Sequence, residues 1–94
     1  MATPTKEEIL AKVISIVAEH LARDPSELKR ETSFVNDLNA DSLDIVEVVM
    51  DIEEAYEITV PDEDAQKIDT VGAAVDYIVQ QLAKRAAGAP PGGQ

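Results

Sequence analysis

The apolar residues of this chain recur at helical spacing in three separate segments, and this pattern constrains the fold more than any other feature. Spacings of three and four residues place side chains on one face of an α-helix. The segments contain, in order, Ile9, Val13, Ile16, Val17 and Leu21; Ile45, Val48, Val49, Ile52 and Tyr56; and Val71, Val75, Ile78 and Leu82. Aromatic residues are only 3% of the chain, whereas a β-sandwich would need more β-branched and aromatic residues in alternation. The pattern therefore predicts an all-α fold with an aliphatic core.

Residues that commonly cap helices stand at the start of each segment. Thr5 precedes the first, and Glu8 follows three residues later, as in a capping box. Asp41 is the expected N-cap of the second helix, with Asp44 adding negative charge to its first turn. Thr70 is the expected N-cap of the last helix. The second helix should then run over residues 41–57.

Prolines mark the end of the first helix and the start of a further, short one. Pro25 disfavours helical geometry at Asp24, so the first helix should end there. Pro61 stands before three acidic residues, a pattern typical of a helix whose first position is proline. This helix should last little beyond Ile68. The expected fold is a four-helix bundle with three longer helices and one short third helix.

A long connection, residues 23–40, separates the first two longer helices. A loop of this length without structure is uncommon in a compact domain. We expect a short turn near residues 26–28 and four apolar side chains that hold the loop against the core. These four are Leu28, Phe34, Val35 and Leu38. The first loop should therefore be structured.

The chain is long enough for one domain, which we place at residues 1–85. Residues 86–94 are rich in alanine, proline and glycine, a composition typical of a disordered tail. The absence of cysteine excludes disulfides, thiolate zinc sites and thiol catalysis. No apolar run approaches the ~20 residues of a membrane span, and the start of the chain has no signal-peptide pattern. These features predict a cytoplasmic protein, which we expect to be a monomer.

The formal net charge is −11, from 19 acidic and 8 basic residues, and the acidic residues are concentrated. No lysine or arginine lies between Arg30 and Lys67, where 12 of the 19 acidic residues are found. Such a surface repels phosphate backbones, which argues against nucleic-acid binding. It attracts partners that carry basic patches. The alternative is a solvated acidic face without a partner, which explains most charge runs.

Ser42 is the strongest candidate for chemistry in this chain. It lies where a polar loop is expected to become the acidic second helix. A hydroxyl at a helix start is exposed and close to backbone N–H groups that have no partner within the helix. These groups and the helix dipole favour a phosphate. The position therefore suits the attachment of a phosphate-linked group.

The second helix carries a second apolar stripe nearly opposite its core-facing one. At about 100° per residue, Leu43, Val46 and Met50 share this side. Glu47 and Glu54 border it. A narrow apolar strip among acidic side chains is typical of a transient binding site, whereas single exposed apolar residues are common on any surface. The shared face beside Ser42 favours the binding interpretation.

The residues around Ser42 resemble those of acyl carrier proteins. The motif Asp-Ser-Leu at 41–43 is typical of that family, and the run 39–44 extends it. Further segments resemble the free-standing bacterial fatty-acid type: 46–54, 60–65, 73–78 and the loop at Phe34, Asp37 and Leu38. A three-residue motif alone occurs by chance. Here the similarity extends over residues 5–82, which makes it specific.

The resemblance implies a four-helix bundle whose serine, here Ser42, receives phosphopantetheine from coenzyme A through a phosphopantetheinyl transferase. The thiol of this arm would hold growing acyl chains as thioesters for fatty-acid synthase enzymes, and the aliphatic interior would shelter the acyl chains. Asp41 and Leu43 would flank the attachment point. The positions implied to meet basic patches on partner enzymes are Asp44, Val46, Glu47, Met50 and Glu54. The protein itself would be a carrier and not an enzyme.

Three positions depart from the usual pattern of this family. Asn39 replaces a glycine, Ile45 replaces a threonine, and Asp51 makes the second helix more acidic. Asparagine tolerates left-handed backbone geometry better than most residues, so the turn at residue 39 can survive. These departures leave a second pathway open, in which the chain is a carrier for polyketide or specialised lipid synthesis.

The residues alone leave two other functional classes to consider, an enzyme and a metal-binding module. A catalytic triad would need Ser42, His20 and an aspartate. However, no nucleophile-elbow motif is present, and His20 is expected near the end of the first helix, interacting with its C-terminus. A metal-binding module could use the acidic residues 62–64, but the EF-hand pattern is absent. We therefore expect neither independent catalysis nor a structural metal site.

Overall fold

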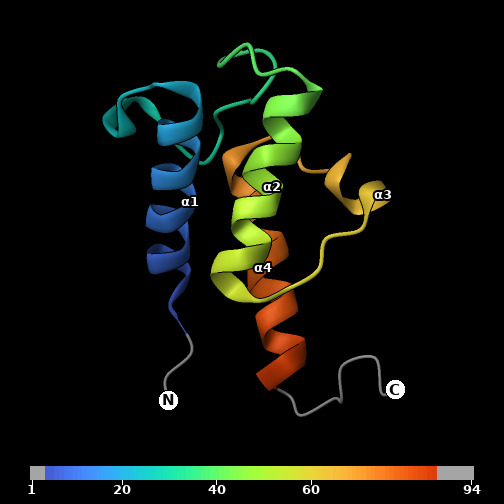
Figure 1. The fold of residues 1–94 in the computed structure, drawn as a ribbon. Coiled ribbons are helices and arrows are strands. Elements are labelled where there is room, and N and C mark those ends of the chain that lie inside the picture. The colour runs from blue at the N-terminus through green and yellow to red at the C-terminus, as the bar shows by residue number, and fades with distance from the viewer. Residues whose placement is uncertain (1–3, 87–94) are drawn as a thin grey trace.

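The computed structural model describes residues 4–86, whose main elements are helices (Figure 1). α1 spans Lys6–Leu21, α2 spans Ser42–Tyr56, α3 spans Asp62–Ala65 and α4 spans Val71–Ala86; a short 3₁₀ helix, η1, covers Pro25–Glu27. α1 packs against both α2 and α4. The four-helix fold, with three longer helices and one short third helix, is confirmed. The short turn expected near residues 26–28 is η1.

The start of α1 follows from local sequence, whereas its end does not. Thr5 and Glu8 form the predicted capping box, in which the Glu8 N–H donates to the Thr5 hydroxyl at 3.1 Å and the Thr5 N–H donates to the Glu8 carboxylate at 2.9 Å. α1 ends at Leu21 because Ala22 adopts a left-handed conformation with a φ of 54°. The helix therefore ends before the predicted stop at Asp24, which instead caps η1.

One aliphatic core fills the space between the longer helices. Its buried side chains include Ile9, Val13, Ile16 and Val17 of α1; Val48, Val49 and Ile52 of α2; and Val71, Ala74, Val75, Ile78 and Leu82 of α4. Leu21, Ile45 and Tyr56 are only partly buried but pack against this core. The core faces predicted from the helical spacing are confirmed.

The loop between α1 and α2 is structured, but one of its four predicted core residues lies outside the core. Leu28, Phe34 and Leu38 are buried, whereas the prediction for Val35 is wrong because it is 54% exposed. Residues 33–38 form a tight turn, in which the N–H of Leu38 donates to the Ser33 carbonyl at 3.2 Å. The turn directs Phe34 and Leu38 into the core and leaves Val35 on its outer side.

Backbone hydrogen bonds fix this loop to the start of α4. The three bonds run from Phe34 N–H to Asp69 O (3.1 Å), from Val71 N–H to Thr32 O (3.0 Å) and from Gly72 N–H to Arg30 O (2.8 Å). Glycine fits closely at residue 72, because a Cβ atom there would lie 3.0 Å from the carbonyl oxygen of Arg30. The loop that leads to Ser42 is thus held by α4, although α4 lies about 30 residues further along the chain.

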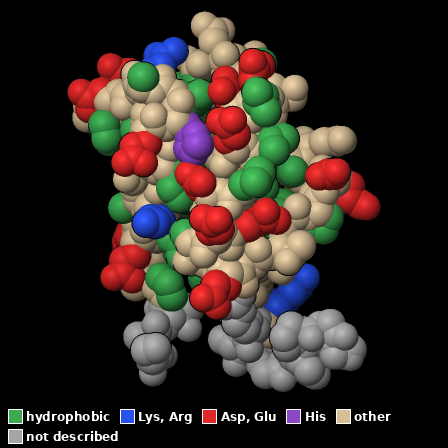
Figure 2. All heavy atoms as spheres, in the orientation of Figure 1, with side chains coloured by type: hydrophobic (Ala, Val, Ile, Leu, Met, Phe, Trp, Pro, Cys, Tyr) green, Lys and Arg blue, Asp and Glu red, His purple; other side chains and the backbone are tan. Residues whose placement is uncertain are grey.

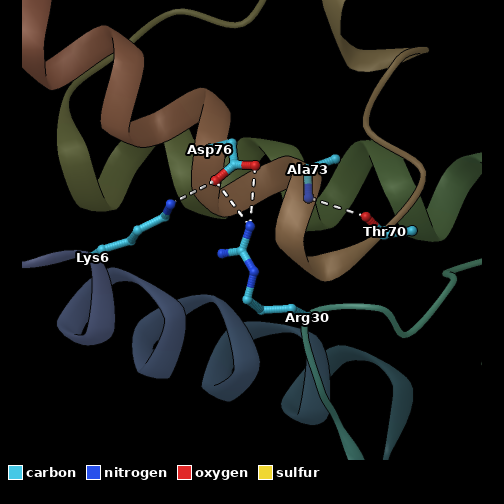
Figure 3. Close-up of polar contacts among 5 residues, drawn as sticks. All are labelled: Lys6, Arg30, Thr70, Ala73 and Asp76. Atoms are coloured by element: carbon cyan, nitrogen blue, oxygen red, sulfur yellow. Dashed lines mark hydrogen bonds and ion pairs between the residues drawn. The ribbon is translucent and has the colours of Figure 1, made fainter.

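Charged side chains from three elements meet beside this junction (Figure 3). Asp76 of α4 accepts two hydrogen bonds of 3.1 Å from the Arg30 guanidinium, and its carboxylate lies 3.5 Å from the Lys6 ammonium. The hydrogen bond from Arg30 is the main cause that lowers the pKa of the Asp76 carboxyl. Thr70 is the predicted cap of α4, and its hydroxyl accepts the Ala73 N–H at 3.1 Å. These exposed ion pairs contribute at most about 1 kcal/mol each.

α3 is shorter than predicted and begins one residue later. Pro61 is its N-cap and not its first helical residue, and the helix ends at Ala65, so Ile68 lies beyond it and is buried. The Tyr77 hydroxyl of α4 donates a 2.8 Å hydrogen bond to the Asp64 carboxylate of α3. Burial, together with this bond, raises the pKa of Tyr77 to about 12. One side-chain hydrogen bond therefore links α3 to α4.

α4 includes Ala86, the first residue of the predicted tail. The other residues of that tail, 87–94, lie outside the described residues, as do residues 1–3. In the part of the chain that the structure describes, none of the helices has the length and apolar character needed to cross a membrane.

Candidate functional site

Asn39 turns the chain from the first loop towards α2. Its φ is 55°, which is the left-handed region, and asparagine enters this region more readily than most residues. Its N–H donates to the Val35 carbonyl at 3.2 Å, and the N–H of Ala40 donates to the Phe34 carbonyl at 2.8 Å. Ala40 is buried. The expectation that the turn survives without glycine is confirmed, and the turn holds the residues before Ser42 against the core.

A reciprocal capping box starts α2. The Asp44 N–H donates to the Asp41 carboxylate at 2.9 Å, and the Asp41 N–H donates to the Asp44 carboxylate at 3.2 Å. Asp41 is the predicted N-cap, but Asp44 does more than add charge to the first turn, since it completes the box. A cap of this kind stabilises a helix by about 1 kcal/mol. The two aspartates thus fix the position at which the helix begins.

Ser42 is the first residue of α2, and its side chain is open to solvent. Within residues 4–86 its hydroxyl forms no hydrogen bond, and the N–H groups of Ser42 and Leu43 have no acceptor. The N–H of Asp44 donates to the Asp41 carboxylate at 2.9 Å, and the N–H of Ile45 donates to the Asp41 carbonyl at 3.1 Å. A phosphate on the Ser42 oxygen would find the unpaired donors at the positive end of the helix dipole.

α2 exposes the second apolar stripe that its sequence predicts. Leu43, Val46 and Met50, which we call the exposed strip, are 64%, 49% and 57% exposed. Glu47 and Glu54 beside it are also exposed. Figure 2 shows apolar side chains in green among red acidic side chains on this face. The strip begins next to Ser42, so a partner bound there would lie beside the serine hydroxyl.

A small cavity lies beneath the first turns of α2. Its volume is about 10 Å³, close to the smallest space that holds a water molecule. Its lining is Leu21, Phe34, Ala40, Asp44, Ile45, Val48, Val49, Ile52, Ile68 and Ala74. The lining is almost entirely apolar, and it includes Asp44 and Ile45 from the turn that carries Ser42. The cavity therefore lies between the first turns of α2 and the core.

His20 does not support a catalytic triad with Ser42. It lies in the last turn of α1, as predicted, but its ring contacts α2 instead of the end of its own helix. Nε2 lies 2.5 Å from the Asp51 carboxylate and Nδ1 lies 3.6 Å from the Glu47 carboxylate. Asp51 is nine residues beyond Ser42, which is about 13 Å along the helix axis. No base therefore activates the serine hydroxyl within the described residues.

Two features of the site were not expected from the sequence. The contact of His20 with α2 joins residues 31 apart in the chain, and the pairing of the loop with α4 joins Arg30 to Gly72. Neither contact has a local sequence signal, because both depend on how the helices pack.

Among residues 4–86 no group of three or more histidine, aspartate or glutamate side chains could hold a metal ion.

A family model described as "Phosphopantetheine attachment site" matches residues 11–78, a range that includes Ser42. The acyl carrier protein of Rubrobacter xylanophilus is 53% identical over 75 residues, which are 80% of this chain and 93% of that protein. The acyl carrier protein of an Exiguobacterium species is 53% identical over 78 residues, which are 83% of this chain and 99% of that protein.

The fold is also similar to a solved structure. The acyl carrier protein from Enterococcus faecalis, studied for the structural components of its high thermal stability, matches with a TM-score of 0.72 and 42% identity. The match covers 83% of this chain and 99% of the Enterococcus chain. Sequence and structure therefore match the same kind of protein over nearly its whole length.

Proposed function

Because the chain belongs to the acyl carrier protein family, we propose that it holds growing acyl chains as thioesters on a phosphopantetheine arm attached to Ser42. Proteins of this family carry phosphopantetheine covalently and are carriers, not catalysts. The arm supplies the thiol for the thioester, which the chain cannot supply because it has no cysteine. We further propose that a phosphopantetheinyl transferase attaches the arm and that fatty-acid synthesis enzymes receive the acyl chains.

The state of the Ser42 hydroxyl is the observation that carries this proposal. It is exposed, it has no hydrogen-bond partner among the described residues, and it stands beside the open N–H groups of Ser42 and Leu43. Asp41 flanks it, but the carboxylate of Asp41 already accepts the N–H of Asp44. The residues present thus fit a phosphodiester at Ser42, since the phosphate gains donors and the nearest carboxylate is engaged elsewhere.

The exposed strip is the surface on which we expect partner enzymes to dock. Its apolar side chains supply contact area, and Glu47 and Glu54 supply negative charge for a basic patch on the partner. Met50 adapts to different partners because its side chain is flexible. Asp44, also a predicted partner residue, is only partly exposed and completes the capping box. Its main role in our proposal is therefore to position Ser42.

The small cavity is the expected entry point for an acyl chain into the core. At about 10 Å³ it has room for no more than one water molecule. An acyl chain would therefore have to part the side chains that line the cavity. Ile68 lies just beyond α3, and α3 is linked to α4 by the Tyr77–Asp64 hydrogen bond. We expect the segment around α3 to be displaced, which would strain the bond of the Val60 N–H to the Glu53 carboxylate (2.7 Å).

Modification of Ser42 is tested by co-expression with a broad-specificity phosphopantetheinyl transferase, followed by intact mass measurement. The chain should gain the mass of one phosphopantetheine group, and Ser42→Ala should gain none. Ser15→Ala is the matched control, because Ser15 is exposed on α1 and should leave the gain intact. A gain that persists in Ser42→Ala would place the attachment elsewhere and contradict the proposal.

Docking is tested by charge reversal beside the exposed strip. Glu47→Lys or Glu54→Lys should weaken association with a carrier-dependent fatty-acid synthase enzyme by about five- to thirty-fold, mostly at low salt. Glu31→Lys makes the same charge change on the exposed loop and is the control. Equal losses for all three variants would show that only the net charge matters. Such a result would refute a specific docking face.

The choice between fatty-acid synthesis and a polyketide or specialised lipid pathway depends on the attached group. Both use the same chemistry at Ser42, so the fold of the carrier is the same. Mass spectrometry of the protein purified from its own source reports the acyl group directly. Straight saturated chains would support fatty-acid synthesis, whereas repeated unreduced carbonyl groups would support the polyketide alternative. The predicted cytoplasmic location and monomeric state stay predictions beside this proposal.

A further inference from the structure

The His20 ring lies between two carboxylates of α2. Its Nε2 contacts Asp51 and its Nδ1 faces Glu47, so one imidazolium would pair with both. The side chain of His20 keeps 25% of its accessible surface, and those of Glu47 and Asp51 keep 50% and 45%. Figure 2 shows the single histidine of the chain in purple at the surface, with red acidic side chains around it. This group is therefore open to solvent and to a bound partner.

Among the described residues, the charged groups that act on His20 are Asp51 and Glu47 of α2 and Glu19 of its own helix. The hydrogen bond to Asp51 is the main cause that raises the pKa of His20 above its usual 6.5, and the charges of all three carboxylates add to it. Burial acts in the opposite direction. The imidazole therefore keeps its proton to a higher pH than an unperturbed histidine does.

The two carboxylates that pair with His20 lie on the side of the exposed strip that faces α1. Around the axis of α2, Glu47 lies about 40° and Asp51 about 80° from Leu43. Glu47 thus belongs both to the acidic border of the strip and to the His20 contact. A basic group of a partner that reaches Glu47 must share this carboxylate with the imidazolium or displace it.

We propose that His20 is a pH-dependent counter-charge on the docking surface, and that its protonation weakens the docking of partners with a basic patch. This inference rests on the proposed function, since it assumes that partners dock on the exposed strip. When His20 is protonated, Glu47 and Asp51 are paired internally and attract a partner less strongly. When His20 is neutral, both carboxylates are available to lysine or arginine side chains of the partner.

The expected size of the effect follows from the exposure of the pair. Surface ion pairs in water change an equilibrium by a factor of about two to five. Protonation should therefore raise the KM or Kd of a basic partner by about two- to five-fold. The effect should fade at high salt, because exposed charges are screened.

The test measures the KM of a phosphopantetheinyl transferase for the unmodified chain between about pH 5.5 and about pH 8. His20→Gln is compared with the parent protein, so that the pH dependence of the transferase itself cancels in the ratio. Lys12→Gln is the control, because it removes a positive charge from the same helix. NMR titration of the His20 ring, in the parent and in Glu47→Gln, gives a second measurement that needs no partner.

The expected result is a ratio of KM values, parent to His20→Gln, that is about two to five at low pH and falls as the pH rises. The corresponding ratio for Lys12→Gln should not change with pH. A His20→Gln ratio that stays constant across the range would overturn the proposal, as would a His20 titration that Glu47→Gln does not shift. Complete absence of modification at Ser42 would instead contradict the proposed function, and the NMR titration would still decide whether His20 pairs with Glu47.

Discussion

Single residues on either side of the start of α2 set the geometry of the proposed attachment site. Asn39 supplies the left-handed turn that most residues adopt only at a cost of about 1–2 kcal/mol. Asp41 and Asp44 then cap the helix, which leaves Ser42 at its first position with an unpaired hydroxyl. Each of these roles depends on the chemistry of one side chain, so each is open to a single substitution.

Asn39→Val should lower the free energy of unfolding by about 1–2 kcal/mol, because a β-branched residue is strained at a positive φ. Asn39→Gly should cost nothing or stabilise slightly, since glycine enters this region freely. Urea unfolding followed by circular dichroism measures both. Asn36→Val is the control, because Asn36 is exposed and its φ is not positive. Equal losses at positions 36 and 39 would contradict the role of the left-handed turn.

His20 should make the stability of the fold depend on pH near neutrality. Its pKa is raised in the folded state, so its pairing with Asp51 stabilises the fold below the unfolded pKa of 6.5. This contribution is lost as the pH rises through the folded pKa. The urea midpoint of the parent should therefore fall between about pH 6 and about pH 8.5, more than that of His20→Gln. Parallel changes in the two proteins would show that other groups are responsible.

At the scale of the elements, α4 helps to position the proposed attachment site although it carries none of its residues. Its first turn pairs with the backbone of the loop, and Asp76 binds Arg30 from the same loop. The loop then passes through its tight turn to Asn39 and α2. α3, by contrast, is four residues long and is linked to α4 by Tyr77. The backbone contacts that position the start of α2 therefore come from the loop and α4.

Gly72→Ala should destabilise the protein although alanine is the better helix former. Alanine would favour the helix by about 1 kcal/mol. Its Cβ, however, would lie 3.0 Å from the Arg30 carbonyl oxygen, and crowding of this kind costs about 1–3 kcal/mol. Hydrogen exchange of the N–H groups of Phe34 and residue 72 should also become faster. A variant more stable than the parent would show that the loop yields easily and that the junction does not hold it.

At the scale of the whole molecule, electrostatic repulsion opposes folding. The net charge is −11, and no lysine or arginine lies between Arg30 and Lys67. In the structure, His20 of α1 pairs with two of the acidic residues in this interval. Repulsion among the others destabilises the compact state at neutral pH. The same negative field would attract the basic partners that we propose, so the charge that weakens the fold would also favour docking.

Added magnesium should therefore raise the melting temperature of the protein. The described residues contain no group that could hold a metal ion at a defined site, so the rise should be gradual and come from screening. Sodium chloride should act in the same direction at higher concentration. Thermal melts followed by circular dichroism across both salt series measure the effect. A flat response to magnesium would show that the repulsion between carboxylates is too weak to matter.

The sequence by itself determined the features that depend on neighbours close along the chain. Helical spacing identified the core faces of α1, α2 and α4, and capping residues located the helix starts at Thr5, Asp41 and Thr70. The exposed strip and the position of Ser42 at the start of α2 followed from the same local rules. These rules hold because a helix places residues three and four apart on one face and leaves its first N–H groups unpaired.

Only the tertiary structure decided the features that join distant residues. Val35 has an apolar side chain of the kind that usually lies in a core, yet the turn at 33–38 leaves it outside the core. The pairing of the loop with α4 and the contact of His20 with Glu47 and Asp51 appear only when the helices pack. The packing of the helices depends on many weak contacts across the core, and these contacts join residues from distant parts of the sequence.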